Sequence, residues 1–281
     1  MKKKIQSVSL IVVLLAASGI FFSCDNIMNK KYGALETDSI HLEETTHLFG
    51  DTAKPACQLT VNLAYITQAD RIGLKDSLNR YFLSTCLGEA YENFEPRQAI
   101  ANYAKRYAHD YRTDLEPSFQ KETTQDDEEI GAWYSYYLRL TGEVVDYEKH
   151  LLVYQCNREE YTGGAHGMYT TTFLNLNLRT LTPIRLEHLF VPDAGEALTD
   201  LLWNQLMADN QVATREELED LGYTSTGDLI PTENFHLNKK GITFYYNVYE
   251  IAPYVMGPIQ ITLPWEMVRH LLNTDVQLPQ N

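Results

Sequence analysis

The sequence predicts an α+β protein with two lobes, each a mostly antiparallel sheet with packed helices. Segments with alternating apolar residues, which are typical of strands, occur between segments with helical spacing. This succession occurs twice, over residues 56–160 and residues 161–275, and we expect one lobe from each round. Short turns join neighbouring strand-like segments, which favours antiparallel pairing. The chain has 281 residues, 44% of them hydrophobic, which is enough for a sizeable core.

The first 23 residues have the pattern of an export signal. Three lysines follow Met1, residues 8–22 are mostly apolar, and Ser23 precedes Cys24. The run is short for a membrane span, and the cysteine at the expected cleavage point resembles a bacterial lipobox. We therefore predict a lipoprotein signal peptide over residues 1–23, lipid on Cys24, and a membrane-anchored protein on the periplasmic or surface side of a bacterial cell envelope. A plain secretory signal is the alternative.

The polar residues 24–55 lack sustained periodicity, and we expect a flexible tether there. The first lobe follows. Its expected elements are a strand at 57–66, helices at 70–87 and 96–111, and strands at 132–140 and 151–156. Asp70 and Pro96 suit the starts of the two helices.

The second lobe begins with a glycine-rich loop and an alternating strand at 170–178. Helices are expected at 195–207 and 215–221, where Thr214 and Glu217 fit a capping box. A hairpin at 235–249, a last strand at 259–263 and a short helix from Pro264 complete the prediction.

The net charge of the chain makes some classes of partner more plausible than others. Removal of residues 1–23 removes three lysines, which leaves 20 basic and 38 acidic residues and a net charge of −18. Phosphate would be repelled, so we expect no nucleic-acid partner. A basic protein is a plausible partner, although the same charge also keeps an exported protein soluble.

Three cysteines remain beside Cys24, namely Cys57, Cys86 and Cys156. Their odd number allows at most one internal disulfide, and we expect small core residues rather than nucleophiles. No spacing resembles a metal site or a nucleotide-binding loop, so neither a metal nor a cofactor is expected. Glu187 and His188 lack a second spaced histidine and are interpreted as surface charge.

The candidate binding loop runs from Tyr161 to Gly167. Gly163, Gly164 and Gly167 allow backbone angles that other residues reach only with strain, and His166 lies among them. A tight turn without function explains the same glycines. Both interpretations remain open at this point.

A second candidate site lies near the end of the expected hairpin. Tyr249, Glu250 and Tyr254 place a carboxylate between aromatic side chains. Such a carboxylate either acts as an acid with a raised pKa or hydrogen-bonds its own loop, and we favour the hydrogen bond.

Three motifs in the second half carry a resemblance to a known family. They are Asn-Phe-His-Leu at 234–237, Gly-Ile-Thr-Phe-Tyr-Tyr at 241–246, and Tyr-Glu-Ile-Ala-Pro-Tyr-Val-Met-Gly at 249–257, in addition to the loop at 161–167. Over residues 56–272 the chain resembles a family of domains of unknown function. That family forms the outer part of the lysozyme-sensing anti-sigma factor RsiV and an accessory part of the peptidoglycan deacetylase PdaC.

The resemblance implies binding rather than catalysis, because the deacetylase chemistry belongs to a separate domain. We therefore expect a non-catalytic ligand-binding domain whose partner is a lysozyme-like basic protein or peptidoglycan. The alternative is a cell-wall glycan hydrolase or deacetylase that uses His166 and Glu250 as acid and base. A structural accessory protein without a ligand is a third interpretation.

Overall fold

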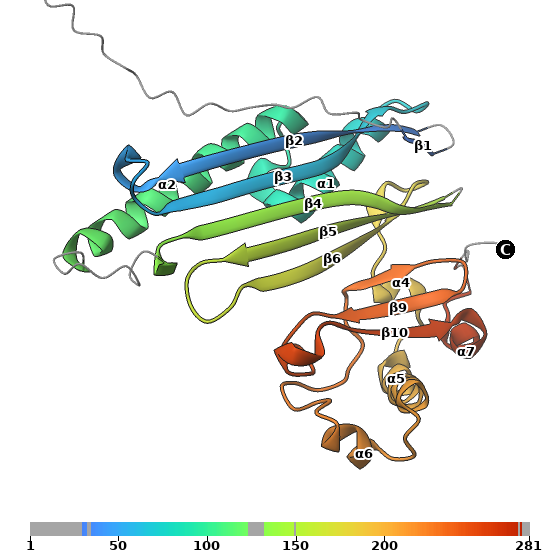
Figure 1. The fold of residues 1–281 in the computed structure, drawn as a ribbon. Coiled ribbons are helices and arrows are strands. Elements are labelled where there is room, and N and C mark those ends of the chain that lie inside the picture. Colours follow the sequence, from blue (N-terminus) through green and yellow to red (C-terminus); the bar gives the residue numbers. More distant parts are fainter. Residues whose placement is uncertain (1–29, 33–34, 123–131, 149, 275, 277–281) are drawn as a thin grey trace, which may run out of the picture.

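The computed structural model describes residues 30–32, 35–122, 132–148, 150–274 and 276. Its larger sheet has seven strands in sequence order, and only the β3–β4 pair is parallel. The strands are β1 (Lys30–Tyr32), β2 (Leu35–His47), β3 (Ala56–Gln68), β4 (Tyr136–Glu148), β5 (Leu151–Tyr161), β6 (Met168–Asn177) and β7 (Thr182–Pro183). Figure 1 shows the long strands side by side, from blue to yellow.

Two helices, α1 (Leu74–Leu87) and α2 (Pro96–Glu122), pack against this sheet. Tyr154 lies at the centre of the packing, fully buried, with its ring stacked on Phe82 at 3.8 Å. Its hydroxyl donates to the carbonyl of Ala64 at 3.0 Å, which satisfies the buried oxygen. Gly142 makes room for that hydroxyl, since a Cβ there would lie 2.2 Å from it.

The second sheet has three antiparallel strands in the order β10-β9-β8. They are β8 (Phe235–Leu237), β9 (Gly241–Tyr246) and β10 (Ile259–Pro264). The helices of this lobe are α4 (Leu186–Leu189), α5 (Ala194–Asn210), α6 (Arg215–Asp220) and α7 (Trp265–Val268). Single 3-10 turns lie at η1 (Leu48–Gly50), η2 (Glu89–Tyr91), η3 (Tyr254–Met256) and η4 (Arg269–Leu271). A separate apolar core fills this lobe, so the predicted α+β class with two lobes is confirmed.

An asparagine side chain joins the two sheets where β6 meets β8. Asn175 on β6 is 3% exposed. Its amide nitrogen donates to the carbonyl of Phe235 at 2.7 Å, and its amide oxygen accepts from the backbone N–H of Leu237 at 2.9 Å. One side-chain amide therefore makes the two bonds that a neighbouring strand would make.

Two more asparagines bond the same edge of β6 from the second lobe. Asn234 donates to the carbonyl of Thr171 at 2.8 Å and accepts from the N–H of Phe173 at 2.9 Å. Asn247 accepts from the N–H of Thr171 at 2.7 Å. These contacts satisfy backbone groups at a sheet edge, where unpaired strands invite aggregation.

Two expectations about the first lobe were wrong. Residues 35–47 of the expected tether form β2, whose Leu35, Ile40 and Leu42 are buried in the core. The sheet also continues past the boundary expected at residue 160, because β6 pairs with β5 along its whole length.

Several element ends differ from the prediction. The first helix begins at Leu74 after Gly73, which has a φ of +77°, rather than at Asp70. The helix α2 continues to Glu122 rather than ending near Tyr111. The strand expected from residue 132 begins at Tyr136.

The three cysteines of the described chain are buried and free. Burial raises the pKa of Cys57 to about 12, so its thiol is neutral at physiological pH. The expectation of small core residues is confirmed for all three.

The signal peptide and Cys24 lie outside the described residues. Among the helices that are described, none has the length and apolar character needed to cross a membrane.

Candidate functional site

The loop between β5 and β6 is held by its own contacts. Gly163 and Gly164 have φ angles of +87° and +103°, which glycine adopts without strain. A Cβ on Gly163 would lie 2.9 Å from the carbonyl oxygen of Trp133, so the loop packs closely there. The hydroxyl of Tyr161 donates to the carbonyl of Gly164 at 2.8 Å. These contacts fix the path of the chain that carries His166.

The loop after β9 presents the second group of candidates. Tyr249 has a φ of +68°, an uncommon angle for a residue with a Cβ. Glu250 accepts from the N–H of Asn247 at 2.8 Å and from its side-chain amide at 3.4 Å. The carboxylate thus hydrogen-bonds its own loop, and this fixes the turn that holds Tyr249 outward with 44% of its surface exposed.

The two candidate groups, 83 positions apart in the sequence, meet in space. The hydroxyl of Tyr249 lies 3.2 Å from Nε2 of His166. The ring of His166 stacks on Tyr254 with centroids 4.2 Å apart and planes 26° apart. His166 therefore contacts both tyrosines from the other lobe, across the junction of the two sheets.

Further tyrosines extend this surface. Tyr169 packs edge-on against Tyr254 at 5.5 Å, and Tyr137 stacks on Tyr161 at 6.0 Å. A Cβ on Gly167 would lie 2.7 Å from the hydroxyl of Tyr137, so the strand that carries Tyr137, β4, lies beside the loop. We call the whole set the aromatic junction, which comprises Tyr137, Tyr161, His166, Tyr169, Tyr249 and Tyr254.

The junction is open to solvent. Tyr137 is 40% exposed, and Val255, next to Tyr254, is 89% exposed. Exposed aromatic rings of this kind are enriched in binding surfaces, because they supply contact area with few rotatable bonds. Desolvation, with smaller contributions from Tyr169, Tyr137 and Tyr249, raises the pKa of Tyr254, so its hydroxyl is neutral at neutral pH.

Sequence reasoning missed Tyr137, Tyr169 and Asn247. The high tyrosine content, 19 residues, was the available signal for the first two, but it does not say which tyrosines gather. Asn247 falls within the hairpin expected at 235–249, but β9 ends at Tyr246 and Asn247 follows it. Its role depends on β6, which lies far away in the sequence.

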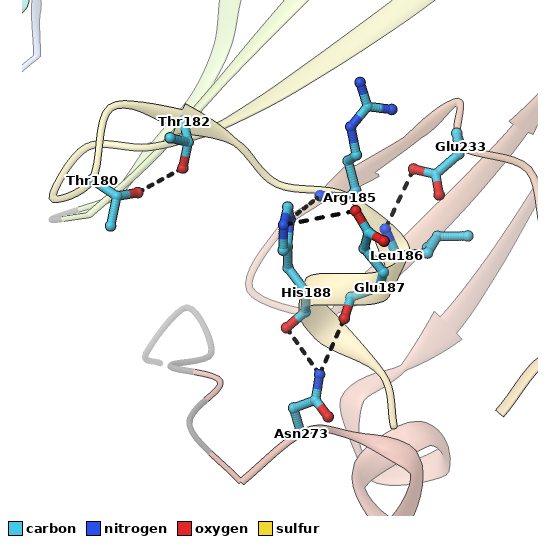
Figure 2. Close-up of polar contacts among 8 residues, drawn as sticks. All are labelled: Thr180, Thr182, Arg185, Leu186, Glu187, His188, Glu233 and Asn273. Carbon is cyan, nitrogen blue, oxygen red and sulfur yellow. Dashed lines mark hydrogen bonds and ion pairs between the residues drawn. The ribbon is translucent and has the colours of Figure 1, made fainter. Parts of the chain in front are cut away.

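His188 has a structural role (Figure 2). Its Nδ1 accepts from the N–H of Arg185 at 3.0 Å, and this caps the start of the short helix α4. Asn273 donates to the carbonyls of Glu187 and His188, both at 3.3 Å. These bonds hold α4 against Asn273. Glu187 and His188 therefore have a structural role in addition to the surface charge that we expected for them.

The contacts also bear on catalysis and metal binding. His166 contacts tyrosines, and Glu250 accepts a hydrogen bond from Asn247. The two residues of the proposed acid–base pair therefore each contact other residues in this structure. Within the ranges the structure describes, no group of three histidine, cysteine or acidic side chains is placed to hold a metal ion.

A cleft of about 490 Å³ lies elsewhere, between α1 and the start of α2. Its lining includes Asp76, Arg80, Phe94 and Glu95. None of the candidate residues from the sequence lines it. Its volume suits a small ligand, but its walls are more polar than those of most ligand pockets.

Family models match both halves of the chain. Residues 51–169 match the model described as deacetylase PdaC. Residues 187–266 match the model described as a protein of unknown function, DUF3298. The aromatic junction is therefore built from both matched regions. A search of curated proteins found no match.

Two crystal structures are similar to the whole fold. A DUF3298 family member from Bacteroides fragilis is 56% identical, with a TM-score of 0.83, and the match covers 88% of this chain and 96% of that one. A DUF3298 family protein from Pseudomonas aeruginosa PAO1 is 16% identical, with a TM-score of 0.63, and the match covers 88% of this chain and 98% of that one. The second likeness shows the fold alone. The first, at this identity and coverage, shows that the chain belongs to the DUF3298 family.

Proposed function

We propose that this protein is a membrane-anchored lipoprotein of the bacterial cell envelope whose folded domain binds a ligand without catalysing a reaction. The observation that carries the proposal is the meeting of His166, Tyr249 and Tyr254 at an exposed junction. The match to the PdaC model, together with the export signal and Cys24, supports a place in the envelope.

The ligand we propose is a lysozyme-like basic protein, with peptidoglycan as the second candidate. The resemblance to the outer part of RsiV supports the first, and the mature net charge of −18 agrees with it. Opposite net charge accelerates encounter, while buried aromatic side chains supply most of the affinity in interfaces of this type. Peptidoglycan is supported by the match to the model of a deacetylase.

A glycan hydrolase or deacetylase remains the alternative function. It needs His166 and Glu250 to act together on a bound sugar. The hydrogen bond from Asn247 holds Glu250 in its own turn, which favours the binding role over the catalytic one.

The direct test is capture of c-type lysozyme and of purified peptidoglycan by the mature chain at low and high salt. The proposal expects capture of lysozyme that weakens at high salt, because screening shortens the reach of charge interactions. Capture of peptidoglycan alone would favour the second ligand. Capture of neither, or release of acetate or of reducing sugar ends from peptidoglycan, would contradict the proposal.

A further inference from the structure

One end of the molecule gathers most of the turns between strands. The chain reverses there between β3 and α1, between β4 and β5, after β6, and between β8 and β9. The ion pair between Lys239 and Glu148, at 3.0 Å, connects the turn of the second lobe to the end of the large sheet. We call this region the turn end; it lies on the right in Figure 1.

The aromatic junction lies at the opposite end of the sheet. β5 begins at the turn end and reaches the junction at Tyr161, while β6 returns from Met168. In the second lobe, β9 likewise begins at the turn end and leads toward Tyr249 and η3 (Figure 1). Thirteen-residue strands such as β3 span about 40 Å, so the two ends are about that far apart.

The turn end has a different charge from the rest of the chain. Among the described residues of its turns (69–73, 150, 178–181 and 238–240), four are basic, Arg71, Arg179, Lys239 and Lys240, and one is acidic, Asp70. Charged residues at the ends of the neighbouring elements flank these turns, namely Glu36, Lys75, Asp76, Asp146 and Glu148. Over the whole mature chain acidic residues outnumber basic ones by 38 to 20. An anionic surface therefore meets less repulsion at these turns than the net charge of the whole chain would give.

An apolar side chain stands out at the same place. Ile72, in the turn between β3 and α1, is 102% exposed, so nothing in the described chain covers it. The side chain of Arg71 beside it bonds the carbonyl of Leu178, which ties this turn to the end of β6. Interfacial membrane segments likewise combine apolar side chains, which enter the headgroup region, with basic ones, which attract anionic lipids.

The short segment between Cys24 and β1 would hold the turn end near a membrane. β1 begins at Lys30 and pairs with the first residues of β2, at the turn end. Cys24 precedes Lys30 by six residues, a span of at most about 20 Å. A lipid on Cys24 therefore holds the folded domain within a distance shorter than its own length.

We propose that the turn end docks on anionic phospholipid headgroups, with Ile72 inserted, and that the aromatic junction points away from the membrane. This inference rests on the anchor in the proposed function. It adds an orientation, in which the ligand-binding surface stands about 40 Å above the bilayer.

Fluorescence quenching tests this orientation. Two variants of the acylated mature chain, Ile72→Cys and Val255→Cys, are labelled with a fluorophore, since the three native thiols of the described chain are buried. Vesicles contain phosphatidylglycerol and a phospholipid with a nitroxide headgroup. We expect several-fold stronger quenching at position 72 than at position 255, and weaker quenching at position 72 in vesicles of phosphatidylcholine. Equal quenching at the two positions, or stronger quenching at 255, would overturn the proposed orientation.

A second arm separates this inference from the anchor. Mass spectrometry of the chain purified from membranes reports lipid on Cys24, and its absence would count against the proposed lipoprotein and not against the docking surface. The labelled Ile72→Cys chain with Cys24→Ala then reports the surface alone. Salt-sensitive quenching on anionic vesicles supports the docking surface, and no quenching on either vesicle overturns it.

Discussion

Replacement of Asn175 by leucine removes the amide that joins the two sheets. Leucine keeps the branched shape of the side chain, with bulkier methyl groups, but the carbonyl of Phe235 and the N–H of Leu237 lose their partners at a site where Asn175 is 3% exposed. Each buried backbone group left unsatisfied costs about 1–3 kcal/mol, so for these two groups we expect a loss of about 2–6 kcal/mol in unfolding free energy. For a protein of this size the loss lowers Tm by roughly 5–15 °C.

Calorimetry and urea unfolding of the Asn175→Leu protein measure this loss. The matched control is Asn273→Leu, since the Asn273 side chain also makes two hydrogen bonds to backbone groups, both to carbonyls at 3.3 Å, but at a position that water reaches. Water replaces those bonds, and we expect a loss below about 1 kcal/mol in the control. A small loss in both variants would refute the claim that asparagine amides hold the lobes together.

Three more predictions concern single side chains. Gly142→Ala places a Cβ 2.2 Å from the hydroxyl of buried Tyr154, and thermal unfolding should show a loss of about 1–3 kcal/mol; an unchanged Tm would mean that the ring moves freely. Burial raises the pKa of Glu44, so its charged form destabilises the fold above the folded pKa and the penalty fades as pH falls. Glu44→Gln should therefore raise Tm at neutral pH, by less as the pH approaches 4, and a lower Tm at neutral pH would contradict this. Thr214→Ala removes the bond to the N–H of Glu217, and urea unfolding should show a loss of about 1 kcal/mol, whereas a loss near zero would mean that the cap does not contribute.

Local patterns predicted most of the elements. The capping box of Thr214 and Glu217 was found from spacing alone, and the structure contains both of its bonds. The hairpin of β8 and β9 and the last strand were visible because their apolar residues alternate. Such signals depend on residues only a few positions apart.

The missed strand β2 shows where this reasoning fails. Its buried residues change phase between Thr37 and Ile40, where two partly exposed residues follow each other, and this interrupts the alternation. One face is polar, and Ile40 and Leu42 become core residues only when β3 and the helices cover them. The local sequence of β2 gives little indication that β3 and the helices cover these two residues.

The site was predicted in part. His166, Tyr249 and Tyr254 were identified from glycine spacing and aromatic content, and the structure brings them together. The asparagines that place the second lobe against β6 were not identified. Their partners lie 60 or more positions away, as between Asn175 and Phe235, and no periodicity reports such contacts.

The most direct test of the account is the affinity of the Tyr254→Ala chain for c-type lysozyme, measured by calorimetry beside the wild type. Tyr254 stacks on His166 at the centre of the junction, and loss of a central aromatic contact weakens binding about tenfold or more. The matched control is Phe94→Ala, whose ring is 40% exposed and lines the cleft between α1 and α2. We predict a large loss for Tyr254→Ala and wild-type affinity for Phe94→Ala; equal affinities, or a loss confined to Phe94→Ala, would contradict binding at the aromatic junction.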